Sequence, residues 1–327
     1  MHSTFHRLAV IAAIVAFCVI VLGAFVRLSD AGLGCPDWPG CYGQLSWPVE
    51  AQAVEEANQA FPERPVESEK AWKEMVHRYL AGALVILVLA LNFLSWKSEN
   101  RQAGFRLLSS ILLLLILFQA ALGMWTVTLK LWPIVVMSHL MGGLATFSML
   151  LWLAYKSGSS APGRALVRNR PLIITGLLVL VIQLALGGWT SANYSALACP
   201  DFPTCQGKMW PDSNFREGFI LWREIGVDYE GGVLDLPSRV AIHIAHRTGA
   251  LFVFIILGWL AIRLVRNKQI QAAGLALGAL LVAQVTLGIL NILLYLPLPN
   301  AVAHSGVGAL LLAMMIWLLH RSTPGRA

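Results

Sequence analysis

The sequence has few charged residues, and they are unevenly distributed. Only 13% of its 327 residues are Asp, Glu, Lys or Arg, whereas about 25% is usual in soluble domains. This scarcity, together with 57% hydrophobic residues, excludes a disordered chain and argues against a single soluble domain. Long stretches without any charge alternate with short polar ones, as in helical proteins that cross a membrane several times.

The apolar stretches are long enough to span a membrane, which takes about 20 residues in a helix. We therefore predict an all-α polytopic membrane protein with eight transmembrane helices. The first stretch is too long for a signal peptide, and Arg27, Ser29 and Asp30 follow it instead of a small-residue cleavage site, so we expect it to be retained. The predicted spans are 8–28, 72–95, 107–127, 134–155, 172–192, 240–262, 270–294 and 301–320.

Basic residues are concentrated in one set of connections, which has a single acidic residue, Glu99. Because Lys and Arg resist translocation, we expect these connections and both termini in the cytoplasm of a bacterium, with the long loops 29–71 and 193–239 outside its inner membrane. The net charge of +7 is thus a topology signal, and no nucleic-acid partner is expected. The basic residues of this set are Arg7, Lys97, Arg101, Arg106, Lys156, Arg164, Arg168, Arg170, Arg263, Arg266, Lys268, Arg321 and Arg326.

Four of the five cysteines lie in the two long outer loops. Cys35 and Cys41 occupy one CPDxPxC segment, and Cys199 and Cys205 occupy the other. In the oxidising compartment outside the inner membrane, each pair is expected to close a small disulfide ring. Free thiols and a metal site are the alternatives.

The two cysteine segments are part of an internal duplication. Residues 23–43 and 187–207 align without a gap at an offset of 164. Three further blocks match in the same order, with offsets of 169, 165 and 165: 74–78 with 243–247, 119–123 with 284–288, and His139 with His304. We predict two four-helix bundles, 1–160 and 161–327, joined by a basic linker. Four spans per half give both halves one orientation, so a pseudo-two-fold axis along the membrane normal should relate them.

Histidines recur near the outer ends of the even-numbered predicted spans. His77 and His139 in the first half match His246 and His304 in the second. Polar side chains within a membrane are costly and usually functional, although a histidine can simply bond a neighbouring helix. Two imidazoles from two helices of one bundle suit the two axial positions of a haem iron. We therefore predict one haem site at each pair.

Other metal centres fit these residues less well. Zinc usually takes three or four protein ligands, and a di-iron site takes several Glu residues with repeated Glu-x-x-His motifs, of which this chain has one, at Glu74 and His77. Arg78 and Arg247 each follow a predicted ligand. They are candidates to bind haem propionates, and the alternative is that they only extend toward the membrane surface.

The halves differ beside the predicted ligands, because Glu74 stands where the second half has His243. The three-residue spacing places Glu74 and His77 on one helix face. A carboxylate one turn from an iron ligand can accept a proton during catalysis, so Glu74 is the candidate catalytic residue. The alternative is a surface charge favoured by the dipole at the start of a helix.

Together these features resemble the haem A synthase family over nearly the whole chain. The resemblance rests on the eight spans, the duplication, the segments GAFVRLSDAGLGCPDWPGC and WKEMVHRYLAG, the QxxLG blocks and the four histidines. It implies oxidation of a ring methyl of haem O to a formyl group, through a hydroxymethyl intermediate, to give haem A. It further implies that His77 and His139 hold the substrate haem O and that His246 and His304 hold a bound haem b. The roles it implies for the remaining residues are a part in the reaction for Glu74 and disulfides for Cys35–Cys41 and Cys199–Cys205.

The resemblance also implies partners: a haem O synthase that supplies the substrate and the assembly machinery of a terminal oxidase that receives the product. An electron donor or acceptor is required but not identified, and a homo-oligomer is compatible with the sequence. The main rival is a quinone-linked diheme electron-transfer cytochrome, which explains the four histidines but not Glu74. A transporter built by duplication would have charged or helix-breaking residues near the membrane midplane, and the spans have few.

Overall fold

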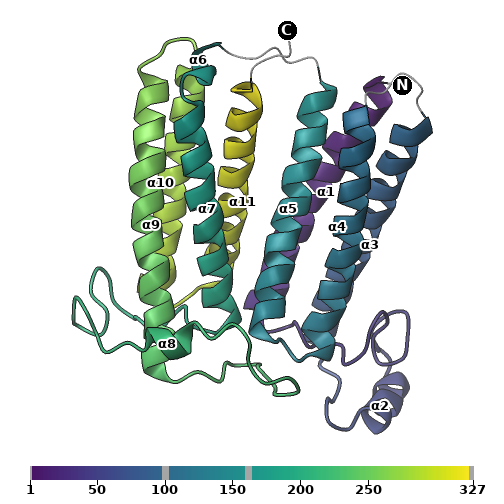
Figure 1. The fold of residues 1–327 in the computed structure, drawn as a ribbon. Helices are drawn as coiled ribbons and strands as arrows, with labels where there is room; N and C mark the ends of the chain where they lie inside the picture. Colours follow the sequence, from purple (N-terminus) through teal and green to yellow (C-terminus); the bar gives the residue numbers. More distant parts are fainter. Residues whose placement is uncertain (1, 98–102, 159–163, 324–327) are drawn as a thin grey trace.

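The computed structural model describes residues 2–97, 103–158 and 164–323, and within these ranges it has helices and two isolated β-bridges but no extended strand. Eight of its helices are long and apolar enough to cross a membrane, which confirms the predicted fold class. They run side by side through the molecule (Figure 1). They are α1 (His2–Leu28), α3 (Ser68–Lys97), α4 (Ala103–Thr128), α5 (Pro133–Ser157), α7 (Arg170–Ala192), α9 (Leu236–Val265), α10 (Gln271–Leu293) and α11 (Leu298–Arg321).

Helices α3 and α9 are the two longest of the described helices, with 30 residues each. At 1.5 Å per residue each measures about 45 Å, which exceeds the roughly 30 Å hydrocarbon core of a bilayer. Both begin four residues before the predicted spans, because loop residues start them. Asp235 caps α9 by accepting a 3.1 Å hydrogen bond from Ser238 N.

Three short helices lie in the connections: α2 (Ala51–Ala60), α6 (Arg164–Val167) and α8 (Phe215–Gly218). Helix α2 lies within the Glu- and Pro-rich segment 44–70, where the sequence indicated no structure. Helices α2 and α8 lie with the long loops at one end of the molecule, and α6 lies at the other end (Figure 1).

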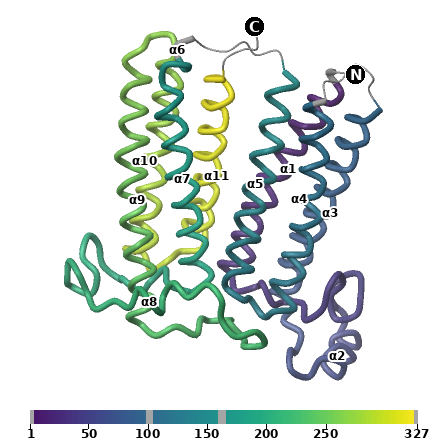
Figure 2. Tube along the Cα trace, in the orientation of Figure 1, coloured from purple at the N-terminus to yellow at the C-terminus, as the bar shows by residue number. Residues whose placement is uncertain are grey.

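The membrane-spanning helices fall into two groups, α1, α3, α4 and α5 on one side and α7, α9, α10 and α11 on the other (Figure 2). Contacts within each group close a ring of four helices. In the first ring, α1 and α4 each contact both α3 and α5, and in the second, α7 and α10 each contact both α9 and α11. The rings meet where α1 packs on α11, α5 on α7, and α5 on α11. The pattern of contacts is unchanged when α1, α3, α4 and α5 are exchanged with α7, α9, α10 and α11, as a pseudo-two-fold axis requires. The axis itself stays a prediction. The predicted boundary at 160/161 falls outside the described residues, as do Glu99, Arg101 and Arg326.

The duplication extends to the backbone of the outer loops. Tyr42 and Gln206, 164 residues apart, have φ of 54° and 55°, and the following Gly43 and Gly207 have φ of 73° and 72°. In each loop these two consecutive residues form a turn that an isolated β-bridge closes. The bridge joins Cys41 to Gln44 in the first loop and Cys205 to Lys208 in the second. The same sequence segment therefore folds the same way twice.

The outer loops also connect the two rings. The Arg64 guanidinium pairs with Asp228 and, at 2.7 Å, with Glu230 of the other half. The backbone N–H of Tyr229 donates to the Lys130 carbonyl at 3.0 Å. At the end of α1, Arg27 donates to the Ser191 carbonyl at 2.6 Å. These contacts fix one half against the other on the side that carries the predicted sites.

The two equivalent helix contacts between the rings are filled differently. Between α5 and α7, the indole of Trp189 is buried and packs near Met137. Between α1 and α11, where Phe25 corresponds to Trp189, an apolar groove of about 610 Å³ is open at the surface. Its lining includes Phe17, Val21, Phe25, Val302, Gly306 and Leu310.

Candidate functional site

The four predicted ligand histidines come from diagonal helices of the two rings. His77 lies on α3 and His139 on α5, which face each other across the first ring, and His246 on α9 and His304 on α11 do so in the second. The helix rise places these histidines roughly 9–15 Å from the outer ends of their helices. The structure therefore brings together the pairs that the sequence predicted.

Each imidazole packs against a glycine on an adjacent helix. A Cβ atom on Gly23 would lie 2.9 Å from Cε1 of His77, and one on Gly123 would lie 3.2 Å from Cε1 of His139. In the second half, the corresponding distances are 3.1 Å from Gly187 to His246 and 3.0 Å from Gly288 to His304. Any side chain at these four positions would push the ring away, so the glycines keep the space that the ring occupies.

A glutamine four residues before the glycine accompanies three of the four histidines. The amide nitrogen of Gln119 lies 3.0 Å from Nδ1 of His139, and that of Gln183 lies 3.0 Å from Nδ1 of His246. The amide nitrogen of Gln284 lies 3.2 Å from Nε2 of His304. Gln183 was not among the predicted residues, although QLALG at 183–187 repeats the QxxLG pattern of 119–123 and 284–288.

The chemistry of these residues fits two haem groups. Among the residues that the structure describes, no three His, Cys, Asp or Glu side chains gather where they could hold a bare metal ion. The histidines instead come in facing pairs inside apolar bundles, with space reserved for each ring. Such a pair supplies two axial ligands to one planar group placed between the helices. The assignment of one haem to each pair stays a prediction.

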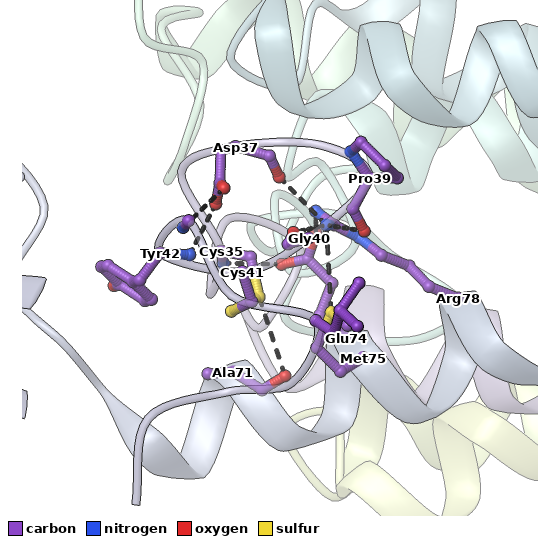
Figure 3. The surroundings of a disulfide bond; sticks show 12 residues. Cys35, Asp37, Pro39, Gly40, Cys41, Tyr42, Ala71, Glu74, Met75 and Arg78 are labelled. Atoms are coloured by element: carbon purple, nitrogen blue, oxygen red, sulfur yellow. Dashed lines mark hydrogen bonds and ion pairs between the residues drawn. A yellow bond between two sulfur atoms is a disulfide. The ribbon is translucent and has the colours of Figure 1, made fainter. Parts of the chain in front are cut away.

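Glu74 lies in the interior and not at the surface (Figure 3). Its side chain is 4% exposed, its Oε2 accepts a 3.0 Å hydrogen bond from Cys35 N, and its Oε1 accepts one from Arg78 Nη2 at 2.5 Å. The alternative of a solvated charge at the helix start is therefore wrong. The carboxylate lies one helical turn outward from His77, beneath the first cysteine loop.

His243 occupies the equivalent place in the second half and is also 4% exposed. Cys199 N lies 3.3 Å from its Nδ1, and Arg247 Nε lies 3.2 Å from its Nε2. The two halves thus place a carboxylate and an imidazole in the same setting, each held by a cysteine N–H and an arginine.

The two arginines attach the cysteine loops to the ligand helices. Arg78 donates from Nη1 to the carbonyls of Asp37, Pro39 and Gly40, as Figure 3 shows. Arg247 donates to the carbonyls of Cys199, Asp201 and Thr204. The sequence analysis did not anticipate this role, because the loop carbonyls are about 40 residues away along the chain. Binding of haem propionates by the same guanidinium groups stays a prediction.

Each cysteine loop is a rigid cap over one histidine pair. Cys35–Cys41 and Cys199–Cys205 are disulfide-bonded. In the first loop the Asp37 carboxylate accepts hydrogen bonds from the N–H groups of Tyr42 and Gly43, at 2.6 and 2.8 Å. The corresponding Asp201 accepts from the Thr204 hydroxyl and from two backbone N–H groups, which together lower the pKa of its carboxyl.

The first loop has an additional layer that the second lacks. Tyr42 packs edge-on against Phe61, just after α2, and its hydroxyl donates to the Pro65 carbonyl at 3.2 Å. Burial, reinforced by the negative charge of Glu67, raises the pKa of Tyr42 to about 12. Segment 44–70 therefore covers the cap above Glu74, which gives this segment a structural role.

Known proteins match this chain over almost its whole length. Residues 6–316 match the COX15-CtaA family, described as cytochrome oxidase assembly protein. The chain belongs to this family. The Heme A synthase of Shewanella oneidensis is 46% identical over 312 residues, which cover 93% of this chain and 94% of that relative. The membership confirms the resemblance inferred from the sequence.

More distant relatives in the COX15-CtaA family match over a similar length. The Heme A synthase of Rhizorhabdus wittichii is 26% identical and that of Shouchella clausii 25%. They align with 94% and 98% of this chain and with 91% and 96% of their own lengths. These matches run nearly end to end and so span both halves of the chain.

Proposed function

We propose that this protein makes haem A from haem O by oxidising a ring methyl to a formyl group, for use in a terminal oxidase. One observation carries the proposal: two duplicated histidine pairs are present, and a buried carboxylate, Glu74, accompanies only one of them. A protein that merely passes electrons between two haems has no need of this difference. The relatives named Heme A synthase support the choice of substrate and product.

The two sites divide the work. His77 and His139 bind haem O, the substrate, in the first half, while His246 and His304 bind a resident haem b in the second. Haem b, when bound, supplies one-electron transfer. Arg78 and Arg247 hold the caps closed over the two sites and are the candidate contacts for haem propionates.

Glu74 serves as the proton acceptor at the substrate site. The Cys35 N–H and the Arg78 guanidinium fix its carboxylate in place, one turn outward from His77. The cap and segment 44–70 exclude bulk water around it, so a proton leaving the substrate has a defined acceptor. General-base catalysis of this kind typically contributes about 10²–10⁴ in rate.

We place the caps on the outer side of a bacterial inner membrane and both termini in the cytoplasm. The described basic residues of the predicted cytoplasmic set lie at the end of the bundles away from the caps; Arg7 is in the first turns of α1, and Lys97 and Arg321 end α3 and α11. This distribution follows the positive-inside rule. Substrate would come from a haem O synthase, and product would pass to oxidase assembly machinery.

Haem analysis of cells tests the proposed function. The protein is produced in cells that synthesise haem O, and haems are extracted from the purified protein and from the membranes. Formylated or hydroxymethylated haem should accumulate with the wild type and not with Glu74→Gln, whereas Glu69→Gln, an exposed carboxylate of the same helix, should behave as wild type. If repeated preparations from cultures that express the protein contain haem b alone, the protein is an electron-transfer cytochrome instead.

A further inference from the structure

The four histidines are not held alike, and His77 is the exception. Three rings lie beside a glutamine amide that precedes the packing glycine by four residues. For His77, whose packing glycine is Gly23, the residue four positions earlier is Val19. Among the residues that the structure describes, Nδ1 of His77 is buried with no hydrogen-bond partner, and so is Nδ1 of His304, whose glutamine lies beside Nε2 instead.

A second difference matches the first. The amides of Gln119 and Gln183 lie directly over Gly142 and Gly249, where an added Cβ would come within 2.2 Å of the amide oxygen. Each of these glycines stands three residues after its histidine. The residue three positions after His77 is Leu80, which is half-buried. The first half thus replaces a glutamine–glycine pair with Val19 and Leu80.

The hydrogen-bond partner of a metal-bound histidine affects the strength of the bond to the metal. An acceptor for the free ring N–H fixes the orientation of the ring and raises its basicity, and its loss typically weakens metal binding about 10- to 100-fold. The amide oxygens of Gln119 and Gln183 have no partner among the described residues, so each can serve as this acceptor once the amide group rotates toward Nδ1. His77 has only packing against Gly23 to orient it, since Val19 and Leu80 offer no polar atom. Its partner across the ring, His139, keeps its glutamine. His77 is therefore held less firmly than His246, its counterpart in the second half.

We propose that Val19 and Leu80 make the first-half site an exchange site, by leaving His77 weakly held. The proposal rests on the function above, in which haem O must enter this site and haem A must leave it, while haem b stays in the other. Val19 and Leu80 are positioning residues, acting through His77. The replacement of Gln183 and Gly249 by Val19 and Leu80 thus explains why two bundles that otherwise match would release haem at different rates.

The test compares haem release from the two sites in reciprocal variants. Purified full-length protein loaded with haem b is mixed with excess apomyoglobin, and haem transfer is followed by absorbance. His139→Ala and His304→Ala assign each kinetic phase to a site, and we expect the faster phase to belong to the first half. The double variant V19Q/L80G should slow that phase about tenfold. Conversely, Q183V/G249L should accelerate the slow phase by a similar factor.

Controls separate this inference from the proposed function. L80G alone changes the helix without adding an amide and should leave the fast phase fast. The inference is overturned if V19Q/L80G binds two haems but releases the first as rapidly as wild type, or if the slower phase belongs to the first half. A wild-type protein that binds no haem overturns the two-site function itself. Repeating the release with haem O should give the same order of rates.

Discussion

The two halves of this molecule share a framework and differ in a few side chains around it. Both have a disulfide cap, an arginine that holds the cap, and glycines that make room for two facing histidines. They differ where Glu74 replaces His243 and where Val19 and Leu80 replace Gln183 and Gly249. We propose that the shared framework builds a pocket for a haem, and that the differing side chains decide whether the pocket stores the haem or acts on it.

Replacing Glu74, the buried acid of the first half, with the histidine of the second half should have the largest effect on turnover. In Glu74→His, the imidazole can still accept the Cys35 N–H, as His243 accepts that of Cys199. We therefore expect a folded protein with unchanged haem binding but with turnover reduced by about 10²–10⁴, the usual contribution of a general base. Haem extraction gives the product, and absorbance of the purified protein gives the haem content.

The reciprocal variant His243→Glu is the matched control for this change. It alters the same setting in the half that we assign to the resident haem, so product formation should persist. Wild-type turnover in Glu74→His would remove this carboxylate from the reaction and would leave the two halves functionally alike at that position.

Filling the space beside His77 should have the next largest effect. In Gly23→Ala, the added methyl would lie 2.9 Å from the imidazole, and overpacking of this kind costs about 1–3 kcal/mol. That cost corresponds to roughly 5- to 150-fold weaker haem binding at the first site. Haem titration of the purified protein measures it.

Gly82→Ala provides the control, because a Cβ on Gly82 meets nothing within 4 Å. Gly187→Ala should weaken the second site in the same manner, since its Cβ would lie 3.1 Å from His246. Equal haem affinity in Gly23→Ala and Gly82→Ala would show that the glycine does not shape the site.

The extra layer over the first cap predicts a pH dependence that the second cap lacks. Tyr42 ionises near pH 12 in the folded loop but near 10 once exposed, so the loop is stable below pH 10 and loses stability as the pH rises toward 12. Proteolysis of segment 44–70 should therefore increase over this range. Tyr42→Phe should remove this pH dependence of proteolysis. A Tyr42 phenol that titrates near pH 10 in the intact protein would contradict the prediction.

The smallest effect is expected at the ion pairs between the halves. Arg64 is partly exposed, and surface pairs typically contribute about 0–1 kcal/mol. Arg64→Ala should lower the midpoint of thermal unfolding slightly, and added salt should reduce the difference. Arg216→Ala, at an exposed position of α8, is the control. A loss of several kcal/mol would mean that this contact holds the halves together.

Sequence patterns predicted the spans and the histidine pairs because both depend on local or repeated signals. Eight apolar runs define eight helices, and the repeat matches His77 with His246 and His139 with His304, which leaves one pair of histidines in each half. The contacts of Arg78 and the burial of Glu74 could not be predicted, because they depend on how the cap folds back onto α3. The role of Gln183 was visible as a third QxxLG block, but only the structure shows that these blocks face histidines.

The most direct test of the account is the haem content of two matched variants, His77→Ala and His246→Ala, purified from cells that make haem O. His320→Ala, at the end of α11 away from the caps, is the control and should match wild type. The account predicts that His246→Ala loses haem b, whereas His77→Ala keeps haem b and loses haem O and haem A. Loss of haem b from His77→Ala, with haem b retained in His246→Ala, would contradict the assignment of the two halves.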